Sequence, residues 1–431
     1  MLRNIKVCMA LLLFLFFGGC AMHQPSEPKG NEKSFAHEDI YIFTALYAEE
    51  LGDYESASKM FESLYKETDK KEYFYRALKN DMAAQQYEKI VQKTDAAALT
   101  IEDVELKRFK VVALIRQNRL EDAKEAALKL ATNSKNVDDY LLVSDIYVKL
   151  KEYEEALKSL ESAYAIEHNE KIMGKIAIIL YMNLERKKDA IAQLETYSRI
   201  YGCSVDICNM LAGFYSNEND VDALVSTYLR MYKLENNSEI AKKIVQIYGY
   251  KREYPKMREF LEESRSDNEL LLQLYIQEKA YKKAAAMAGE LYEESGDALF
   301  LGQSAIFEYE SSEDKNDKAM QKSVIAKLKE VIEIKKDAMY LNYLGYLLID
   351  HDVDVKKGIV YVQEALKIEP NSAYYLDSLA WGYYKLQKCS EAAKIMKKIR
   401  TMQGGDNEEV VKHAKAIEEC EKIQKRKKEQ K

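Results

Sequence analysis

Apolar residues recur three and four positions apart along most of this chain, which is the spacing of one buried face of an α-helix. The segment from Asp138 to His168 is representative, because its apolar positions form two such runs on either side of a short turn at Glu152 and Tyr153. The first run contains Tyr140, Val143, Tyr147 and Leu150, and the second contains Ala156, Leu160 and Ala163. The pattern predicts two helices folded back on each other.

The same pattern recurs along the chain, marked by a small residue in the second helix of each unit. Neighbouring markers lie at or near 33 to 34 residues apart: Ala57, Ala123, Ala156, Ala190, Ala223 and Ala392, with weaker members at Ile90, Met257, Ala284 and Gly358. Small side chains suit positions where two helices cross at ~8–10 Å. The period predicts an all-α fold, a right-handed α-solenoid of about eleven helix-turn-helix units over residues 37–403.

The repeat is less regular in two places, and it ends in a different element. The unit that ends at Met287 is short, and Glu308 to Lys318 reads as an inserted polar loop. Residues 404–431 predict a capping helix and a basic tail, with apolar positions at Val410, Val411, Ala414, Ile417 and Ile423. A solvated helix end explains the basic tail, and contact with anionic lipid or cell-wall polymer is the alternative.

Composition agrees with a helical array and narrows the class of partner. Glycine, at 16 residues, and proline, at 4, are scarce, as expected of helices joined by short loops. The formal charge of −7 is spread along the chain and argues against a nucleic-acid surface, which needs a basic stripe.

The amino terminus has the features of a secretory signal. Arg3 and Lys6 precede an apolar run from Val7 to Phe17, which is shorter than the ~20 residues of a membrane-spanning helix. The run ends in Gly18-Gly19-Cys20 and so resembles a bacterial lipoprotein signal, although that family usually has a smaller aliphatic residue than Phe17. The resemblance implies a signal over residues 1–19 and a lipid on Cys20. A secreted protein without lipid is the alternative.

Residues 20–36 predict a tether that follows the lipid site. Pro25, Pro28 and Gly30 interrupt any apolar periodicity, and such a linker spans roughly 20–25 Å on average. The residue after the cysteine is Ala21 rather than Asp, which by resemblance to Gram-negative lipoproteins implies outer-membrane sorting.

The last two units carry the sharpest motifs. Asn342-Tyr343-Leu344-Gly345-Tyr346 opens one unit, Pro370 follows its second helix, and Asp377-Ser378-Leu379-Ala380-Trp381-Gly382-Tyr383 opens the next. These residues resemble tetratricopeptide repeats. Together with the lipoprotein signal and Tyr47 to Tyr54, they are similar to a family of proteobacterial tetratricopeptide outer-membrane lipoproteins. One type in that family is an adaptor for a periplasmic carboxy-terminal processing protease.

The cysteines suggest two crosslinks in an oxidising compartment. After Cys8 and Cys20, four cysteines remain. An antiparallel return of the cap would bring residue 420 beside residue 389, which predicts a Cys389–Cys420 disulfide, with two buried thiols as the alternative. Cys203 and Cys208 flank a turn and could also pair, although five residues make a tight loop.

Candidate catalytic and metal sites are not found in the sequence. The histidines (His23, His37, His168, His351 and His413) are scattered, without metal-ligand spacing. Asp350-His351-Asp352-Val353-Asp354 could coordinate a cation, but an ordinary polar turn is the preferred interpretation. We therefore expect no catalytic residue, no metal and no cofactor.

Tyrosine, at 32 residues, is the one compositional excess, and most of these side chains are expected in the core. By helical phase, some polar and aromatic residues of the first helices could instead face the concave side, where aromatic side chains with polar neighbours suit a peptide-binding groove. These candidate partner-binding residues are Tyr215, Tyr250, Asn342, Tyr346, Asp377, Trp381, Tyr384 and Lys385.

These features together predict a non-catalytic scaffold or adaptor. It would be lipid-anchored at the periplasmic face of the outer membrane and would recruit a periplasmic protein, such as a processing protease or a cell-wall hydrolase. Nucleic acid and small-molecule substrates are not expected as partners. The alternative is an assembly factor for outer-membrane barrel proteins or pilus secretins, although such factors are shorter.

Overall fold

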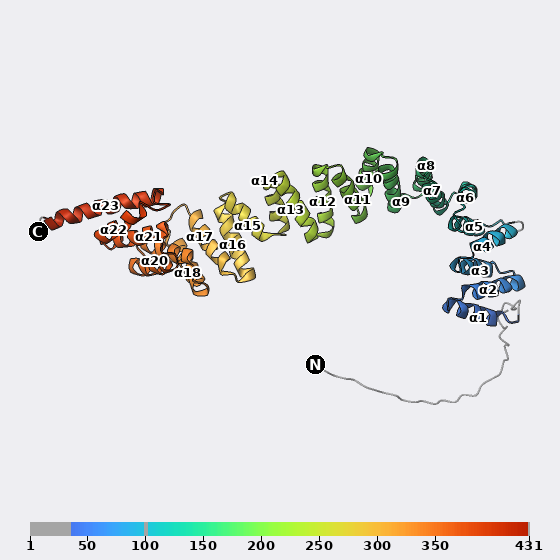
Figure 1. The fold of residues 1–431 in the computed structure, drawn as a ribbon, viewed down its shortest axis with the longest axis horizontal. Helices are drawn as coiled ribbons and strands as arrows, with labels where there is room; N and C mark the ends of the chain where they lie inside the picture. Colours follow the sequence, from blue (N-terminus) through green and yellow to red (C-terminus); the bar gives the residue numbers. More distant parts are fainter. Residues whose placement is uncertain (1–35, 99–101, 430–431) are drawn as a thin grey trace, which may run out of the picture. The chain divides into compact units, whose positions relative to one another are not determined.

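The computed structural model describes residues 36–98 and 102–429, and all regular structure in these ranges is helical (Figure 1). Helices α1 to α22 form eleven consecutive pairs, followed by a single helix, α23. The predicted all-α array of helix-turn-helix units is therefore confirmed. The chain divides into two compact units, Met1–Gly202 and Cys203–Lys431.

The first unit contains five helix pairs. Their bounds are α1 (Glu38–Glu50), α2 (Tyr54–Thr68), α3 (Lys71–Ala83), α4 (Tyr87–Ala97), α5 (Val104–Arg116), α6 (Leu120–Ser134), α7 (Val137–Leu150), α8 (Tyr153–Ile166), α9 (Glu170–Ile178) with the π-helix η1 (Ile179–Asn183), and α10 (Lys187–Tyr201).

The second unit contains six pairs and the last helix. Their bounds are α11 (Val205–Asn217), α12 (Val221–Glu235), α13 (Ser238–Lys251), α14 (Tyr254–Ser264), α15 (Asn268–Gln277), α16 (Tyr281–Ser295), α17 (Ala298–Ser311), α18 (Lys318–Ile334), α19 (Ala338–Asp350), α20 (Val355–Ile368), α21 (Ala373–Lys385), α22 (Cys389–Ile399) and α23 (Glu408–Glu429).

The turn within each helix pair is built in the same way along the chain. In ten of the eleven pairs one turn residue has a positive φ, in the left-handed region, and only the first of these ten is glycine. The backbone N–H of the following residue then bonds to a carbonyl near the end of the first helix, as in Glu152 to Tyr147 at 2.9 Å. This is the Schellman arrangement, which satisfies carbonyls that a helix end leaves open. The residues are Gly52, Gln85, Asn118, Lys151, Glu185, Asn219, Arg252, Lys279, Asp352 and Gln387.

The π-helix η1 accounts for one irregularity of the repeat. Ala156 and Ala190 are 34 residues apart, whereas the three preceding steps are of 33. A π-helical turn takes up one extra residue without breaking the helix. The added residue in this unit therefore lies in η1, immediately before the turn at Glu185.

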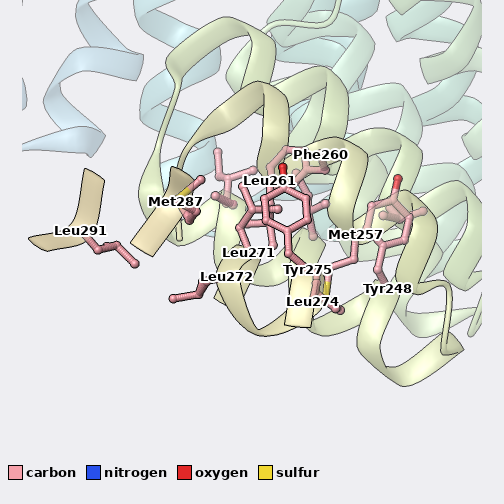
Figure 2. Close-up of a cluster of buried hydrophobic side chains, with 14 of the residues drawn as sticks. Tyr248, Met257, Phe260, Leu261, Leu271, Leu272, Leu274, Tyr275, Met287 and Leu291 are labelled. Carbon is pink, nitrogen blue, oxygen red and sulfur yellow. The ribbon is translucent and has the colours of Figure 1, made fainter. Parts of the chain in front are cut away.

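Within each compact unit, the core of one helix pair continues into the next pair. Figure 2 shows this in the second unit, where Met257, Phe260 and Leu261 of α14 pack with Leu271 and Tyr275 of α15. The same cluster extends to residues of α13 and α16. The clusters of the described residues thus extend over more than one helix pair, as expected for stacked repeats.

The structure corrects two sequence predictions, one about a polar loop and one about the buried side of the last helix. Residues 308–311, expected to begin a polar loop, form the last turn of α17, so that only residues 312–317 form the connection to α18. In α23, Val410, Ala414 and Ile417 are buried as expected, but Val411 and Ile423 are exposed. The buried stripe of α23 is narrower than predicted because the helix contacts α21 and α22 along one side only.

Candidate partner-binding surface

Trp381, the only tryptophan of the chain, lies at the centre of a ring cluster on α21. Its indole stacks on Tyr384 with ring centroids 4.6 Å apart, and on His413 of α23 at 4.0 Å. The indole Nε1 donates a 2.9 Å hydrogen bond to Asp350 Oδ1 at the end of α19. The side chain thus joins α21 to α19 and to α23, which fixes its orientation.

His413 of α23 packs in this ring cluster, where it stacks on Trp381. Its Nδ1 lies 2.9 Å from Asp377 Oδ2, and both side chains are buried. A buried polar group is expensive unless it is hydrogen-bonded, so each residue stabilises the burial of the other. Because α23 carries His413 and α21 carries Asp377, the pair fastens the cap to the first-helix surface of the last unit.

Two partly buried phenols of α19 donate to carboxylates of other helices. The hydroxyl of Tyr346 bonds to Glu409 of α23, and that of Tyr343 bonds to Glu310 of α17 at 3.1 Å. Burial raises the pKa of both phenols, and the hydrogen bonds to the carboxylates raise it further. Both groups are therefore neutral hydrogen-bond donors over the physiological range.

Tyr309 and His351 extend the cluster toward α17. Tyr309 Oη lies 2.9 Å from His351 Nε2. Burial raises the pKa of Tyr309 to about 12 and lowers the pKa of His351. We refer to the partly exposed Tyr343, Tyr346, Trp381 and Tyr384 as the aromatic surface; they lie on the first helices α19 and α21. The buried Tyr309 of α17 packs edge-on against Tyr343.

The acidic residues of the turn at 350–354 contact other groups of the same chain. Lys385 donates to the Asp350 carbonyl at 2.9 Å and pairs with Asp352 at 2.8 Å. Asp354 caps α20 by accepting from the Lys357 N–H at 3.0 Å. These contacts explain the acidic residues by turn and helix-end chemistry, and in residues 36–98 and 102–429 no group of His, Cys, Asp and Glu side chains could hold a metal ion.

The eight predicted binding residues divide by exposure. Tyr250 of α13 is 81% exposed, and Asn342, Tyr346, Trp381, Tyr384 and Lys385 are partly exposed. Two predictions are corrected: Tyr215, 8% exposed, packs in α11, and Asp377, 5% exposed, lies under α23. Helical phase places a residue on a face of its helix, but it does not show that a distant helix covers that face.

The structure joins all four described cysteines in pairs. Cys389 and Cys420 form a disulfide between α22 and α23, with Cα atoms 5.7 Å apart. Cys203 and Cys208 form a second one before and within α11, with Cα atoms 5.5 Å apart. Cys20, the predicted lipid site, lies outside the described residues.

Three residues that contact the rings of the aromatic surface are not predicted from the sequence: Glu310, His413 and Glu409. His413 contacts a residue 36 positions away, and Glu409 one 63 positions away, so no repeat spacing relates either pair. Glu310 was assigned to a polar loop, although it lies 33 residues before Tyr343, one repeat earlier. The repeat period was a signal that could have found Glu310.

Comparisons with known proteins give structural neighbours only. No family model matches the chain, and no curated protein matches it. Solved structures similar to it include Naa15/Naa10 bound to HypK-THB, with 13% identity over 88% of this chain and 66% of that chain and a TM-score of 0.30. Yeast Tom70 has 14% identity over 90% and 96%, with a TM-score of 0.32. A tetratricopeptide repeat protein from Parabacteroides merdae has 14% identity over 65% and 98%, with a TM-score of 0.28.

The TM-scores of these three structures lie between 0.28 and 0.32, so the description of the fold rests on the helix pairs themselves.

Among the described residues, no helix has the length and apolar character needed to span a bilayer.

Proposed function

We propose that the protein is a non-catalytic scaffold that binds another protein on its first-helix surface. The observation that carries this proposal is the aromatic surface, in which large rings are held by hydrogen bonds to neighbouring helices. Partly exposed aromatic side chains of fixed orientation bind a partner with little loss of conformational entropy. Because α19 and α21 contribute the rings and α17 contributes Glu310 at the border, the surface is long enough for an extended segment or a helix.

The aromatic surface also has polar groups suited to orienting a partner. Glu310 and Glu409 are exposed acceptors at its border, and Lys385 is a donor beside Trp381. Rings surrounded by hydrogen-bonding groups match the composition of protein interfaces. Tyr250, on α13, offers a further exposed aromatic side chain.

The finer proposal concerns place and partner. Cys20 would carry a lipid that holds the protein at the periplasmic face of an outer membrane, and the partner would be a processing protease or a cell-wall hydrolase. Support comes from the signal-like residues 1–20 and from the resemblance to adaptor lipoproteins. Anchoring would raise the local concentration of the bound partner without a new contact.

Site-specific photocrosslinking in cells tests partner binding. A photoreactive residue at Tyr250 or Tyr384 should capture a defined protein, whereas the same residue at Lys158, exposed on the second helix α8, should not. Capture of a protease or hydrolase supports the adaptor, and capture of a barrel protein or secretin supports an assembly factor. Equal capture from all three positions would argue against the aromatic surface as the binding site.

Palmitate labelling tests the anchor separately. The wild-type chain should incorporate labelled palmitate and fractionate with outer membranes, and Cys20→Ala should do neither. If the wild-type chain incorporates no labelled palmitate, the proposed anchor is wrong. The proposed binding surface is tested separately, by the crosslinking experiment.

A further inference from the structure

Helix α1 and the residue that follows it carry a stripe of large, exposed apolar side chains. The stripe consists of Ile40, Phe43, Tyr47 and Leu51, which are all exposed and lie at helical spacing. Phe43, 72% exposed, stacks on Tyr47 with ring centroids 6.5 Å apart. We call these four residues the α1 stripe.

In the following four pairs the part of this face that corresponds to Tyr47 is buried, whereas the equivalents of Phe43 stay partly or fully exposed (Arg76, Phe109, Leu142 and Lys175). One repeat after Tyr47 lies Asn80, and further repeats bring Ala113, Ile146 and Leu180 to this position, all of them buried. Repeats bury their cores against neighbours, so the Tyr47 side of this face is a packing side. Among the described residues no helix precedes α1, and Tyr47 is exposed there.

The length of chain before α1 indicates what could lie against the stripe. Seventeen residues, 21–37, separate Cys20 from Glu38. Whatever its conformation, a chain of that length reaches at most ~60 Å. A lipid on Cys20 would therefore limit how far α1 can lie from the bilayer surface. Of the described helices, α1 follows Cys20 most closely in sequence.

The side chains of the stripe suit the boundary between water and lipid. Tyrosine is enriched there because its ring is apolar and its hydroxyl is wet, and an exposed apolar stripe on a helix can lie in the plane of the interface. Two of the four carboxylates of α1 are paired: Lys70 Nζ bonds to Glu38 at 2.6 Å, and Arg76 Nη2 bonds to Glu49 at 2.6 Å. These two charges therefore oppose approach to lipid less than free carboxylates would.

A second copy of the chain fits the stripe less well. A helix of 13 residues is ~20 Å long, so two crossed stripes would bury only a few side chains each. Stable dimers generally bury ~1,200–2,000 Å². A bilayer can cover the whole stripe, and its contact with the stripe does not depend on burying the area that a stable dimer needs.

We propose that the α1 stripe rests on the lipid bilayer, with Phe43 and Leu51 among the headgroups and upper acyl chains. This inference rests on the proposed lipid anchor at Cys20. A lipid tether alone fixes only the distance to the membrane. Contact through α1 also fixes the orientation of the first helix pair, so that the following pairs extend from a defined starting direction.

Fluorescence quenching by brominated lipid tests the contact. The lipidated full chain is inserted into phosphatidylethanolamine–phosphatidylglycerol vesicles that contain phosphatidylcholine brominated near the headgroup. Because Trp381 is the only tryptophan, Phe43→Trp in a Trp381→Phe background reports on α1 alone. Its emission should shift to the blue and be quenched about twofold. Tyr250→Trp in the same background, equally exposed before vesicles are added, should be unaffected.

The possible outcomes separate the contact from the anchor. Chain that floats with vesicles but shows no quenching at residue 43 keeps the anchor and overturns the contact. Chain that does not float overturns the anchor and this inference with it. Equal quenching at residues 43 and 250 would mean that the molecule lies flat. Concentration-dependent protection of residue 43 from iodide without vesicles would assign the stripe to a second copy. Either of these last two results overturns the proposal.

Discussion

Gly345 and Gly358 let the backbones of α19 and α20 touch. A methyl group at Gly345 would lie 2.7 Å from the Gly358 carbonyl oxygen and 2.6 Å from Val362 Cγ2, and one at Gly358 would lie 2.6 Å from the Gly345 carbonyl oxygen. The repeat pattern identifies Gly358 as the small position of its unit. It does not show that Gly345 opposes it, because the register of two helices depends on the turn between them.

Gly345→Ala should therefore destabilise the protein although alanine is the better helix former. We expect a loss of about 1–3 kcal/mol, because the added methyl group meets backbone that cannot move aside. Gly213→Ala in α11 is the control, since a methyl group there meets nothing within 4 Å, and it should stabilise by about 0.5–1 kcal/mol. Urea unfolding followed by circular dichroism measures both, and equal effects would contradict the close crossing.

Asp139 illustrates the electrostatic side of packing between pairs. This carboxylate of α7 is 1% exposed and accepts two bonds from the Arg108 guanidinium of α5, at 2.7 and 3.0 Å. Burial raises its pKa, but the bonds from Arg108 and Ser134 outweigh burial, and the net pKa lies below the ordinary value. Its stabilising contribution is therefore present above the unfolded pKa of ~3.9 and is lost as the pH falls through the lower, folded value.

Asp139→Asn should thus destabilise in a pH-dependent way. We expect a loss of about 1.5–3 kcal/mol at neutral pH, and the difference from the wild type should narrow below about pH 4. Asp145→Asn on the same helix removes an exposed pair with Lys175 and should cost about 0–1 kcal/mol. Urea midpoints over a pH series measure the effect. A difference for Asp139→Asn that is constant with pH would be inconsistent with the ion pair as its source.

At the scale of elements, the cap α23 shows what sequence patterns can and cannot predict. Its existence and much of its buried stripe follow from helical periodicity, and its antiparallel return beside α22 follows from the short connection. The contacts of Glu409 and His413 with α19 and α21 could not be predicted, because they depend on how far the cap extends over earlier helices. The same contacts explain why Asp377, a predicted binding residue, is buried instead.

The Cys389–Cys420 disulfide should hold the cap more firmly than any single contact. It closes a loop of 31 residues, and replacing both cysteines with serine should cost about 3–4 kcal/mol by the chain-entropy relation. The same replacement of Cys203 and Cys208, which close a loop of only 5 residues, should cost about 1.5 kcal/mol less. Limited proteolysis of α23 measures the local effect. Cleavage of α23 at the wild-type rate after loss of Cys389 and Cys420 would rule out this role.

For the whole molecule, the repeat period predicted the number of helix pairs, the small crossing residues and the last helix. It could not predict η1, because an added residue can enter a turn as readily as a helix. It also could not show the division into two compact units at Gly202, since the period of 33 to 34 residues continues across it. Local spacing carries information on neighbouring helices and little on how contacts are distributed over hundreds of residues.

A chain with this organisation should lose structure locally. Leu160→Ala in α8 removes a fully buried side chain and should cost about 2–5 kcal/mol. Because each pair contacts only its neighbours, amide hydrogen exchange should accelerate in α5 to α10, while α19 to α22 stay as protected as in the wild type. Mass spectrometry of peptic fragments reads each helix. Equal acceleration throughout the chain would show that the molecule unfolds as one cooperative body.

The recurring left-handed turn has a consequence for biosynthesis. Each pair is completed by hydrogen bonds between residues at most a few positions apart, and its two helices meet within about 33 residues of chain. A polypeptide leaving a ribosome or a translocation pore can thus finish one hairpin before the next has emerged. If the pairs fold in the order of synthesis, each buries most of its apolar surface against chain that has just emerged. Among the described helices, the exposed face of α1 is the exception.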